Sequence, residues 1–160
     1  MKIVARLFLL LFSLTVAHAQ TCSSAQPWGM SGQSVPDPVT NIVYNPPANS
    51  PSGMMGTATL PYIVPIGSYL EITDMIGEKY NVSGTVVYAP FTGTSPPSSN
   101  NAFLFSLSTA SHAGLWHGSI KLSAGTQLNL LIMDTEPLVG SPGTHQVLGW
   151  NLSGRLCATP

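Results

Sequence analysis

Apolar and polar residues alternate along most of the chain after residue 57. Strict alternation places successive side chains on opposite faces of a pleated strand, so the pattern predicts half-buried β-strands. In the stretch 115–122, Trp116 and Ile120 share one face, whereas His117 and Lys121 share the other. The expected strands of this part of the chain are 57–64, 69–75, 80–88, 102–108, 115–122, 127–133 and 146–157.

Residues 20–56 show no such alternation and are rich in Pro, Ser and Gly. Proline cannot donate to a strand ladder, so we expect a loop-rich segment with one short strand at 41–44. The folded core is then expected to span residues 57–160. The prolines that interrupt the first segment are Pro27, Pro36, Pro38, Pro46, Pro47 and Pro51.

About eight strands without an amphipathic helix predict an all-β, antiparallel β-sandwich, because half-buried strands need a second sheet to cover their apolar faces. Segment 64–72 also resembles segment 122–130: each has a strand end, a tight turn with glycine (Gly67 or Gly125), and a new strand. Two similar halves favour a jelly roll. An immunoglobulin-like sandwich is the alternative, although its Cys–Trp–Cys spacing is missing.

The first nineteen residues have the features of a cleaved signal peptide: a basic start, an apolar run at 7–16 and small residues before a cleavage site. Their bacterial appearance leads us to expect an exported protein, either periplasmic or secreted. Without Lys2 and Arg6, three strong bases (5 minus 2) face six acidic residues, giving a formal charge of −3. Three scattered bases exclude nucleic acid as a natural partner, and no other apolar run is long enough to predict a membrane span.

Cys22 and Cys157 are the two cysteines, one near each end of the expected mature chain. In an oxidising compartment such a pair predicts a disulfide. The bond would close a loop of 136 residues (22 through 157), worth roughly 4–5 kcal/mol in the chain-entropy model. It should hold both termini against the sandwich.

The sequence shows no catalytic motif, so we expect no catalytic residues and no enzyme. The GxSxG pentapeptide of a serine nucleophile is missing. Glu71 falls on the polar face of its strand, while Asp74 and Glu78 flank an expected turn at Gly77. We interpret these carboxylates as solvent-facing groups rather than a catalytic pair.

We also expect no metal site and no cofactor. His112 and His117 are five residues apart around a glycine, which does not give the His-x-His of a cupin, and His145 lies far along the chain. The methionines are not at a spacing from a histidine that would indicate a shared copper site. Both cysteines are expected to form a disulfide, so neither is available as a copper ligand. Asp134 and Glu136 alone make a poor calcium cage.

A neutral polar ligand such as a carbohydrate fits this composition better, because only 7% of residues are charged. Trp150 shares parity with leucines and is expected in the core. Trp28 lies outside any alternating run and is our best candidate for an exposed aromatic platform. The candidate ligand-binding residues are Trp28, Trp116, His117, Asp134 and Glu136.

The sequence therefore predicts a secreted, non-enzymatic module that binds a neutral polar ligand, such as a glycan or another cell-surface partner, through loops and aromatics. The alternative is a structural or adhesive subunit that associates by strand addition, which would show an unpaired hydrophobic edge strand. A secreted hydrolase is a third reading, and it requires a histidine within reach of a serine or carboxylate inside a pocket. The sequence does not indicate the oligomeric state.

Overall fold

The computed structural model describes residues 22–35, 37, 40–55, 59–80, 84–94, 96–98, 101–135 and 147–160. Ten β-strands and no helix lie in these ranges, and none of the described residues form a helix able to cross a bilayer. The expected signal peptide (1–19), Glu136 and His145 lie outside them.

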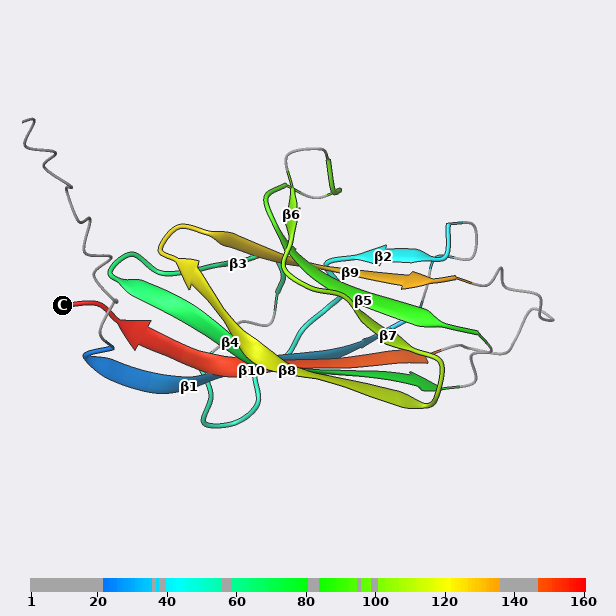
Figure 1. The fold of residues 1–160 in the computed structure, drawn as a ribbon, viewed down its shortest axis with the longest axis horizontal. Coiled ribbons are helices and arrows are strands. Elements are labelled where there is room, and N and C mark those ends of the chain that lie inside the picture. The colour runs from blue at the N-terminus through cyan, green and yellow to red at the C-terminus, as the bar shows by residue number, and fades with distance from the viewer. Residues whose placement is uncertain are drawn as a thin grey trace, which may run out of the picture.

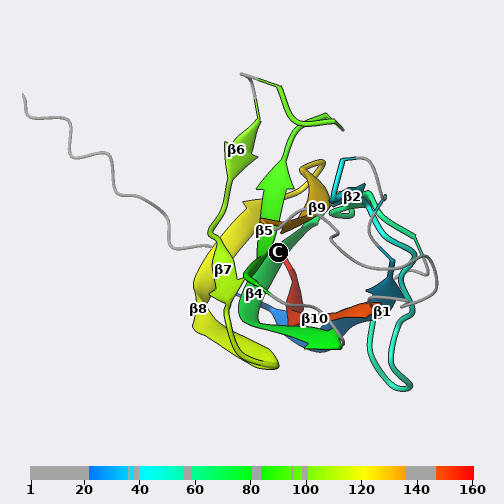
Figure 2. The same ribbon diagram turned by 90° about the vertical axis from the view of Figure 1, so that its right-hand side faces the viewer.

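The strands form two antiparallel sheets stacked as a sandwich (Figures 1 and 2). The four-stranded sheet has the order β1 (Ser24–Ser34), β10 (Val147–Ala158), β4 (Ser68–Tyr80), β8 (Ala113–Ser123). The six-stranded sheet has the order β2 (Ile42–Tyr44), β9 (Gln127–Asp134), β5 (Val86–Thr92), β6 (Ala102–Phe103). Its two remaining strands are short: β3 (Tyr62–Ile63) pairs with β9, and β7 (Leu107–Thr109) pairs with β5.

This strand order is that of a jelly roll. The chain crosses between the sheets at each major connection, so β1, β4, β8 and β10 share one sheet while the intervening strands form the other. An immunoglobulin-like sandwich would instead keep several consecutive strands as neighbours in one sheet. The predicted antiparallel β-sandwich is therefore confirmed, and its topology is the jelly-roll one.

The core between the sheets consists of the inward-facing set of each alternating strand. In β9, Leu128, Leu130 and Ile132 are fully buried, and in β10, Leu148 and Leu152 are. This confirms the faces that the alternation predicts for these strands.

The two glycine turns also match the sequence interpretation. Gly67 has φ of 74° and Gly125 has φ of 76°, a region that glycine enters without steric cost. The two similar segments meet in space, since Val64 N–H donates to Thr126 O at 3.0 Å and Gly125 N–H donates to Val64 O at 2.8 Å.

The expectation of one short strand within residues 20–56 is wrong, because β1 is an eleven-residue strand paired along its whole length with β10. Pro27 sits inside it without breaking the ladder. Its carbonyl accepts from Met55 N–H at 2.7 Å, on the side away from β10, so its missing N–H falls on that side too. The short strand expected at 41–44 is present as β2.

The expected strand at 80–88 is also wrong: β4 ends at Tyr80, β5 begins at Val86 in the other sheet, and Gly84 between them has φ of 79°. The turn expected at Gly77 is absent, because Gly77 lies inside β4. A Cβ atom there would approach the ring of Tyr88 to 2.5 Å, so this glycine makes room for an aromatic ring.

Candidate binding groove

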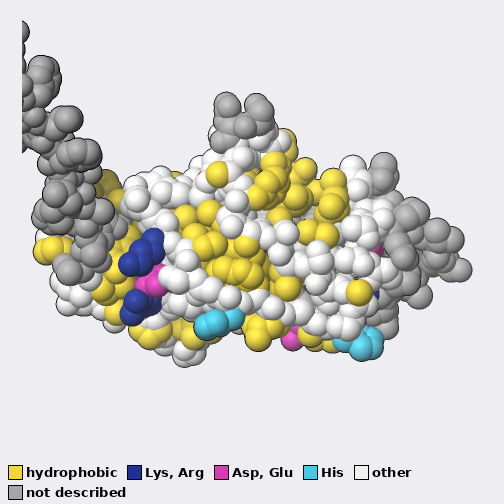
Figure 3. All heavy atoms as spheres, viewed as in Figure 1, with side chains coloured by type: hydrophobic (Ala, Val, Ile, Leu, Met, Phe, Trp, Pro, Cys, Tyr) yellow, Lys and Arg dark blue, Asp and Glu magenta, His cyan; other side chains and the backbone are white. Residues whose placement is uncertain are grey.

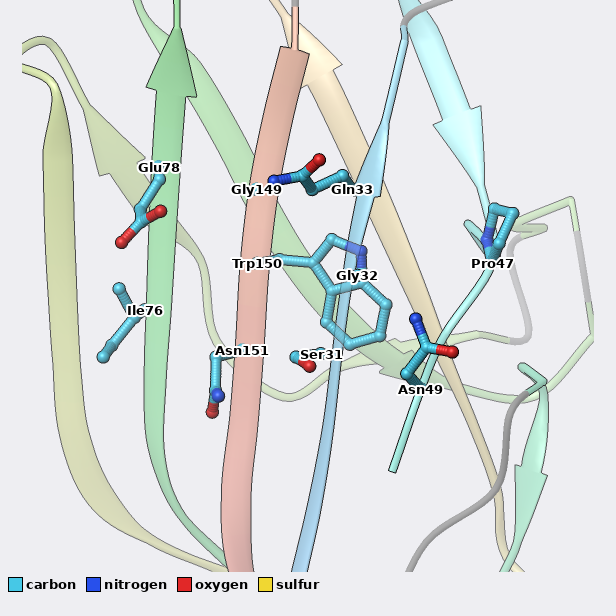
Figure 4. A pocket seen from close by; sticks show the side chains of 10 residues that line it. All are labelled: Ser31, Gly32, Gln33, Pro47, Asn49, Ile76, Glu78, Gly149, Trp150 and Asn151. Atoms are coloured by element: carbon cyan, nitrogen blue, oxygen red, sulfur yellow. The ribbon is translucent and has the colours of Figure 1, made fainter. Parts of the chain in front are cut away.

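A groove of about 540 Å³ runs along the outer face of the four-stranded sheet, over β1, β10 and β4 (Figure 4). It is lined by Ser31, Gly32, Gln33, Pro47, Asn49, Ile76, Glu78, Gly149, Trp150 and Asn151. None of these residues was among the candidate ligand-binding residues from the sequence.

The strand register explains which side chains reach the groove. Gln33, Gly149 and Glu78 form one row across the sheet, and Ser31, Asn151 and Ile76 form a second. The row between these two contains Trp150 and Gly77 and faces the core. Because side chains alternate between the two faces of a sheet, the rows on either side of it face outward. Gly149 leaves the middle of the floor without a side chain.

Four polar side chains of the lining have no hydrogen-bond partner within the described part of the chain: Ser31, Gln33, Asn49 and Asn151. Glu78 is the lining carboxylate among these residues, and the Tyr80 hydroxyl donates to its Oε2 at 2.6 Å. This hydrogen bond and the negative charge of Glu78 raise the pKa of Tyr80 above its usual value. The groove therefore presents amide and hydroxyl groups beside one carboxylate, that of Glu78, which is positioned by the Tyr80 hydroxyl.

Residues 47–55 run along the edge of β1 that lies away from β10, and this segment forms one wall of the groove. Ser31 N–H donates to Asn49 O at 2.9 Å and Asn49 N–H donates to Ser31 O at 2.7 Å. Further along, Gly29 N–H donates to Met55 O at 3.1 Å, and the Met54 sulfur lies over Gly29, where a Cβ atom would clash with it. These contacts fix the wall that carries Pro47 and Asn49.

Trp150 lies between β10 and the wall. Its side chain is 3% exposed, and Nε1 has no hydrogen-bond partner among the described residues. A Cβ atom on Gly32 would lie 2.9 Å from Nε1, so the indole occupies the space that this glycine leaves. The interpretation of Trp150 as a core residue is confirmed.

Trp28 is not an exposed platform, and that expectation is wrong. Its side chain is fully buried, and its ring centroid lies 5.3 Å from that of Tyr62. The physical reason is the pairing of β1: as part of the four-stranded sheet, Trp28 falls on the core-facing parity together with Met30.

Trp116 and His117 lie in β8, on opposite faces as the alternation predicts. Trp116 is half-buried and stacks on Phe105 with ring centroids 3.8 Å apart. His117 is exposed, and its Nδ1 lies 2.6 Å from Asp74 Oδ1. The Thr73 hydroxyl donates to Asp74 Oδ2 at 2.6 Å, and both contacts hold the pKa of Asp74 below its usual value, that of Thr73 more strongly.

The structure does not bring the candidate residues from the sequence into one site. Trp28 and Trp116 lie on the two opposite edge strands of the four-stranded sheet, β1 and β8. These strands are three strand spacings, or about 14 Å, apart. Asp134 is buried in the other sheet at the end of β9. The His117–Asp74 pair lies on an exposed strand surface rather than in the groove.

Glu71 is not the solvent-facing carboxylate that its strand parity indicates. Its side chain is 8% exposed, because Arg155 from β10 and Ser119 from β8 cover it. Lys79 is also buried, with its ammonium group donating to the carbonyl of Gly84. Among the described residues, no group of three or more His, Cys, Asp or Glu side chains converges as a metal site.

The disulfide predicted from the sequence is present between Cys22 and Cys157, whose Cα atoms are 5.1 Å apart. It joins Cys22, two residues before β1, to Cys157 near the end of β10, where Cys157 pairs with Ala25 of β1. The bond therefore secures the edge of the sheet that carries the groove wall.

No protein-family model matches this chain, and no curated protein sequence matches it. Among solved structures, murine APRIL at pH 8.0 is similar with a TM-score of 0.49 and 13% identity, over 80% of this chain and 98% of that one. Murine APRIL at pH 8.5 gives 0.48 at the same identity and coverage. Eiger TNF from S. frugiperda gives 0.36 and 11% identity, over 79% of this chain and 90% of that one.

Proposed function

We propose that this protein is an exported, non-catalytic β-sandwich module that binds a neutral, polyhydroxylated ligand such as a glycan in the outer-face groove. The observation that carries the proposal is the set of unpaired polar side chains along the groove: Ser31, Gln33, Asn49 and Asn151. Concave sites with a few well-placed polar groups are the usual binding sites of small molecules.

The chemistry of these side chains suits a sugar. Carboxamides and hydroxyls both donate and accept hydrogen bonds, as sugar hydroxyls do. Glu78, with one oxygen bonded by Tyr80, supplies an acceptor and repels anionic ligands. Ile76 is 39% exposed at the groove and offers an apolar contact for the face of a ring.

Binding is favoured over hydrolysis because the described lining of the groove contains one carboxylate and not the two that glycoside hydrolysis needs. Glycoside hydrolysis needs two carboxyl groups about 5–9.5 Å apart on either side of the bond. Within the described lining, Glu78 stands alone, and Asp74 on the same strand is engaged by Thr73 and His117. A groove that offers hydrogen bonds to hydroxyl groups without a second acid is suited to recognition.

Export is supported by the disulfide together with the signal-like first nineteen residues. Disulfides persist in the periplasm and outside the cell, where glycans of cell surfaces are accessible. A cell-surface or matrix carbohydrate is therefore the ligand class we propose.

Glycan-array screening of the purified protein, followed by calorimetry with the best hit, tests this proposal. Asn151→Ala and Gln33→Ala should each weaken binding about three- to tenfold, the effect of one lost hydrogen bond. Gln26→Ala is the matched control for Gln33→Ala, because Gln26 is an exposed glutamine of β1 outside the groove. Equal effects of the two glutamine variants, or no glycan bound at all, would refute the proposal.

Filling the floor gives an independent check. Gly149→Leu adds a side chain in the outer-facing row, where the nearest atom to a Cβ is the terminal oxygen of Glu78 at 3.3 Å. This variant should fold and should lose glycan binding entirely. Retained affinity would show that the ligand binds elsewhere.

A further inference from the structure

Tyr80 is an exposed aromatic residue of the sheet that carries the groove. Within the described part of the chain, the exposed aromatic side chains are Tyr44, Tyr80 and Phe103, and of these Tyr80 belongs to the four-stranded sheet. Tyr80 follows Glu78 by two positions on β4, and Lys79 between them is buried. Because side chains alternate along a strand, Tyr80 projects from the same outer face as Glu78.

Two contacts place the Tyr80 ring at one end of the groove. Its hydroxyl donates to Glu78 Oε2 at 2.6 Å. A Cβ atom on Gly149 would lie 3.3 Å from the same oxygen and 3.7 Å from Cε2 of Tyr80. Glu78 and Gly149 both line the groove, on neighbouring strands (Figure 4). The ring therefore borders the part of the floor where the glycine leaves open space.

The hydrogen bond to Glu78 restrains the orientation of the ring. A tyrosine side chain has two rotatable angles, and holding its hydroxyl limits both. A group that is already held in its binding orientation loses less conformational entropy when a ligand binds. The Tyr80 ring is 48% exposed, so it offers a preorganised apolar surface beside the polar lining.

We propose that Tyr80 is the stacking platform of the groove, and that a neutral pyranose ring binds with its C–H face against the aromatic ring and its hydroxyl groups toward Glu78. This inference rests on the proposed function and names the class of sugar that the groove takes. The face of an aromatic ring is electronegative and attracts the weakly positive C–H bonds of a pyranose. The second carboxylate oxygen of Glu78 can accept from a hydroxyl at the edge of the same sugar ring.

The charges at this end of the groove favour an uncharged sugar. Glu78 repels the carboxylate of a uronic acid and the sulfate of a sulfated sugar. No Lys or Arg lines the groove within the part of the chain that the structure describes, so an acidic sugar would find no basic partner there. Figure 3 also shows few charged side chains on the face that it draws.

Calorimetry with three neutral trisaccharides, cellotriose, mannotriose and N-acetylchitotriose, tests the inference. At least one should bind the wild-type protein. Tyr80→Ala should weaken that binding about five- to tenfold, the effect of losing one aromatic stacking contact. Tyr80→Phe should weaken it about threefold or less, because it keeps the ring and loses the hydrogen bond to Glu78. Tyr44→Ala is the matched control, an exposed tyrosine of the other sheet, and should bind as the wild type does.

The outcomes separate this inference from the proposed function. If Asn151→Ala weakens binding while Tyr80→Ala binds as tightly as Tyr44→Ala, the groove binds sugar but Tyr80 is not its platform. Equal losses for Tyr80→Ala and Tyr80→Phe would also overturn the inference, because the residue would then act through Glu78 alone. Binding of none of the three trisaccharides, with an array hit on another class of glycan, would overturn the pyranose assignment and leave the proposed function standing.

Saturation-transfer NMR gives a readout that a merely structural role of Tyr80 would not change. Irradiation of the aromatic protons should transfer saturation to the ring C–H protons of the bound trisaccharide, because these protons lie against Tyr80. At sugar concentrations that saturate each variant, the transfer should fall in Tyr80→Ala and persist in Tyr80→Phe. Equal transfer in Tyr80→Ala and in the wild type would rule out stacking on this ring.

Discussion

Arg155 Nε donates to Glu71 Oε2 at 2.7 Å, joining β10 to β4 on the outer face of the four-stranded sheet. Ser119 from β8 donates to the other carboxylate oxygen at 2.6 Å. These hydrogen bonds, first that of Ser119 and then that of Arg155, hold the pKa of Glu71 below its usual value despite the burial of the side chain. The carboxylate thus links three neighbouring strands.

Arg155→Ala should lower the free energy of unfolding, because it leaves one oxygen of a buried carboxylate without its donor. Arg155→Lys should fall between the wild type and Arg155→Ala, since lysine keeps the charge but lacks the planar guanidinium. Urea unfolding measures both. An Arg155→Ala variant as stable as the wild type would show that this pair does not stabilise the sheet.

The stability should decrease in acid because of Glu71 and Asp74. Both pKa values are lowered in the folded protein from ordinary values of 4.5 and 3.8. Each group therefore contributes stability that is fully present above its ordinary pKa and is lost as the pH falls through the folded one. The double variant Glu71→Gln/Asp74→Asn should show a flatter dependence of unfolding free energy on pH between about 5 and 2. Identical slopes would contradict this assignment.

Trp28 and Trp116 should respond differently to truncation. Trp28→Ala removes a fully buried ring and should cost about 3–5 kcal/mol. Trp116→Ala should cost less, because its ring is half-buried and stacks on Phe105 near the edge of the sandwich. Thermal unfolding at a fixed protein concentration compares them. The reverse order would mean that β1 does not pack as the structure shows.

Gly67→Ala and Gly125→Ala should each destabilise the protein by about 1–2 kcal/mol, the cost of a left-handed backbone for a residue with a Cβ. No atom lies within 4 Å of a Cβ at either position, so backbone strain is the whole effect. Gly77→Ala should cost more, because its methyl group would overlap the Tyr88 ring. Chemical denaturation of the three variants gives the ranking, and a harmless Gly77→Ala would contradict it.

Much of the fold follows from local pattern. The faces of β8, β9 and β10, the two glycine turns and the antiparallel sandwich are all present as the sequence indicates. Period-two alternation is a property of neighbouring residues, and positive φ is a property of one residue. Neither depends on which strands lie side by side.

The errors at β1, at Glu71 and at the groove share one cause, which is the lateral pairing of strands. The prolines of residues 20–56 led to the wrong prediction for β1. Pro27 interrupts a ladder only if its missing N–H lies on the side that pairs with β10, and the sequence does not indicate that side. Glu71 has the parity of a surface residue, yet Arg155 and Ser119 come from strands 84 and 48 positions away and cover it. The groove residues were missed for the same reason, since Gln33, Gly149 and Glu78 are adjacent only through strand register.

The sequence by itself determined that the chain forms alternating strands with glycine turns and a bond between its two cysteines. Only the tertiary structure decided that Trp28 is buried, that polar side chains from β1, β4 and β10 line one groove, and that β8 ends the sheet. The alternation arises within each strand, whereas a groove or a free edge depends on the order in which distant strands come together.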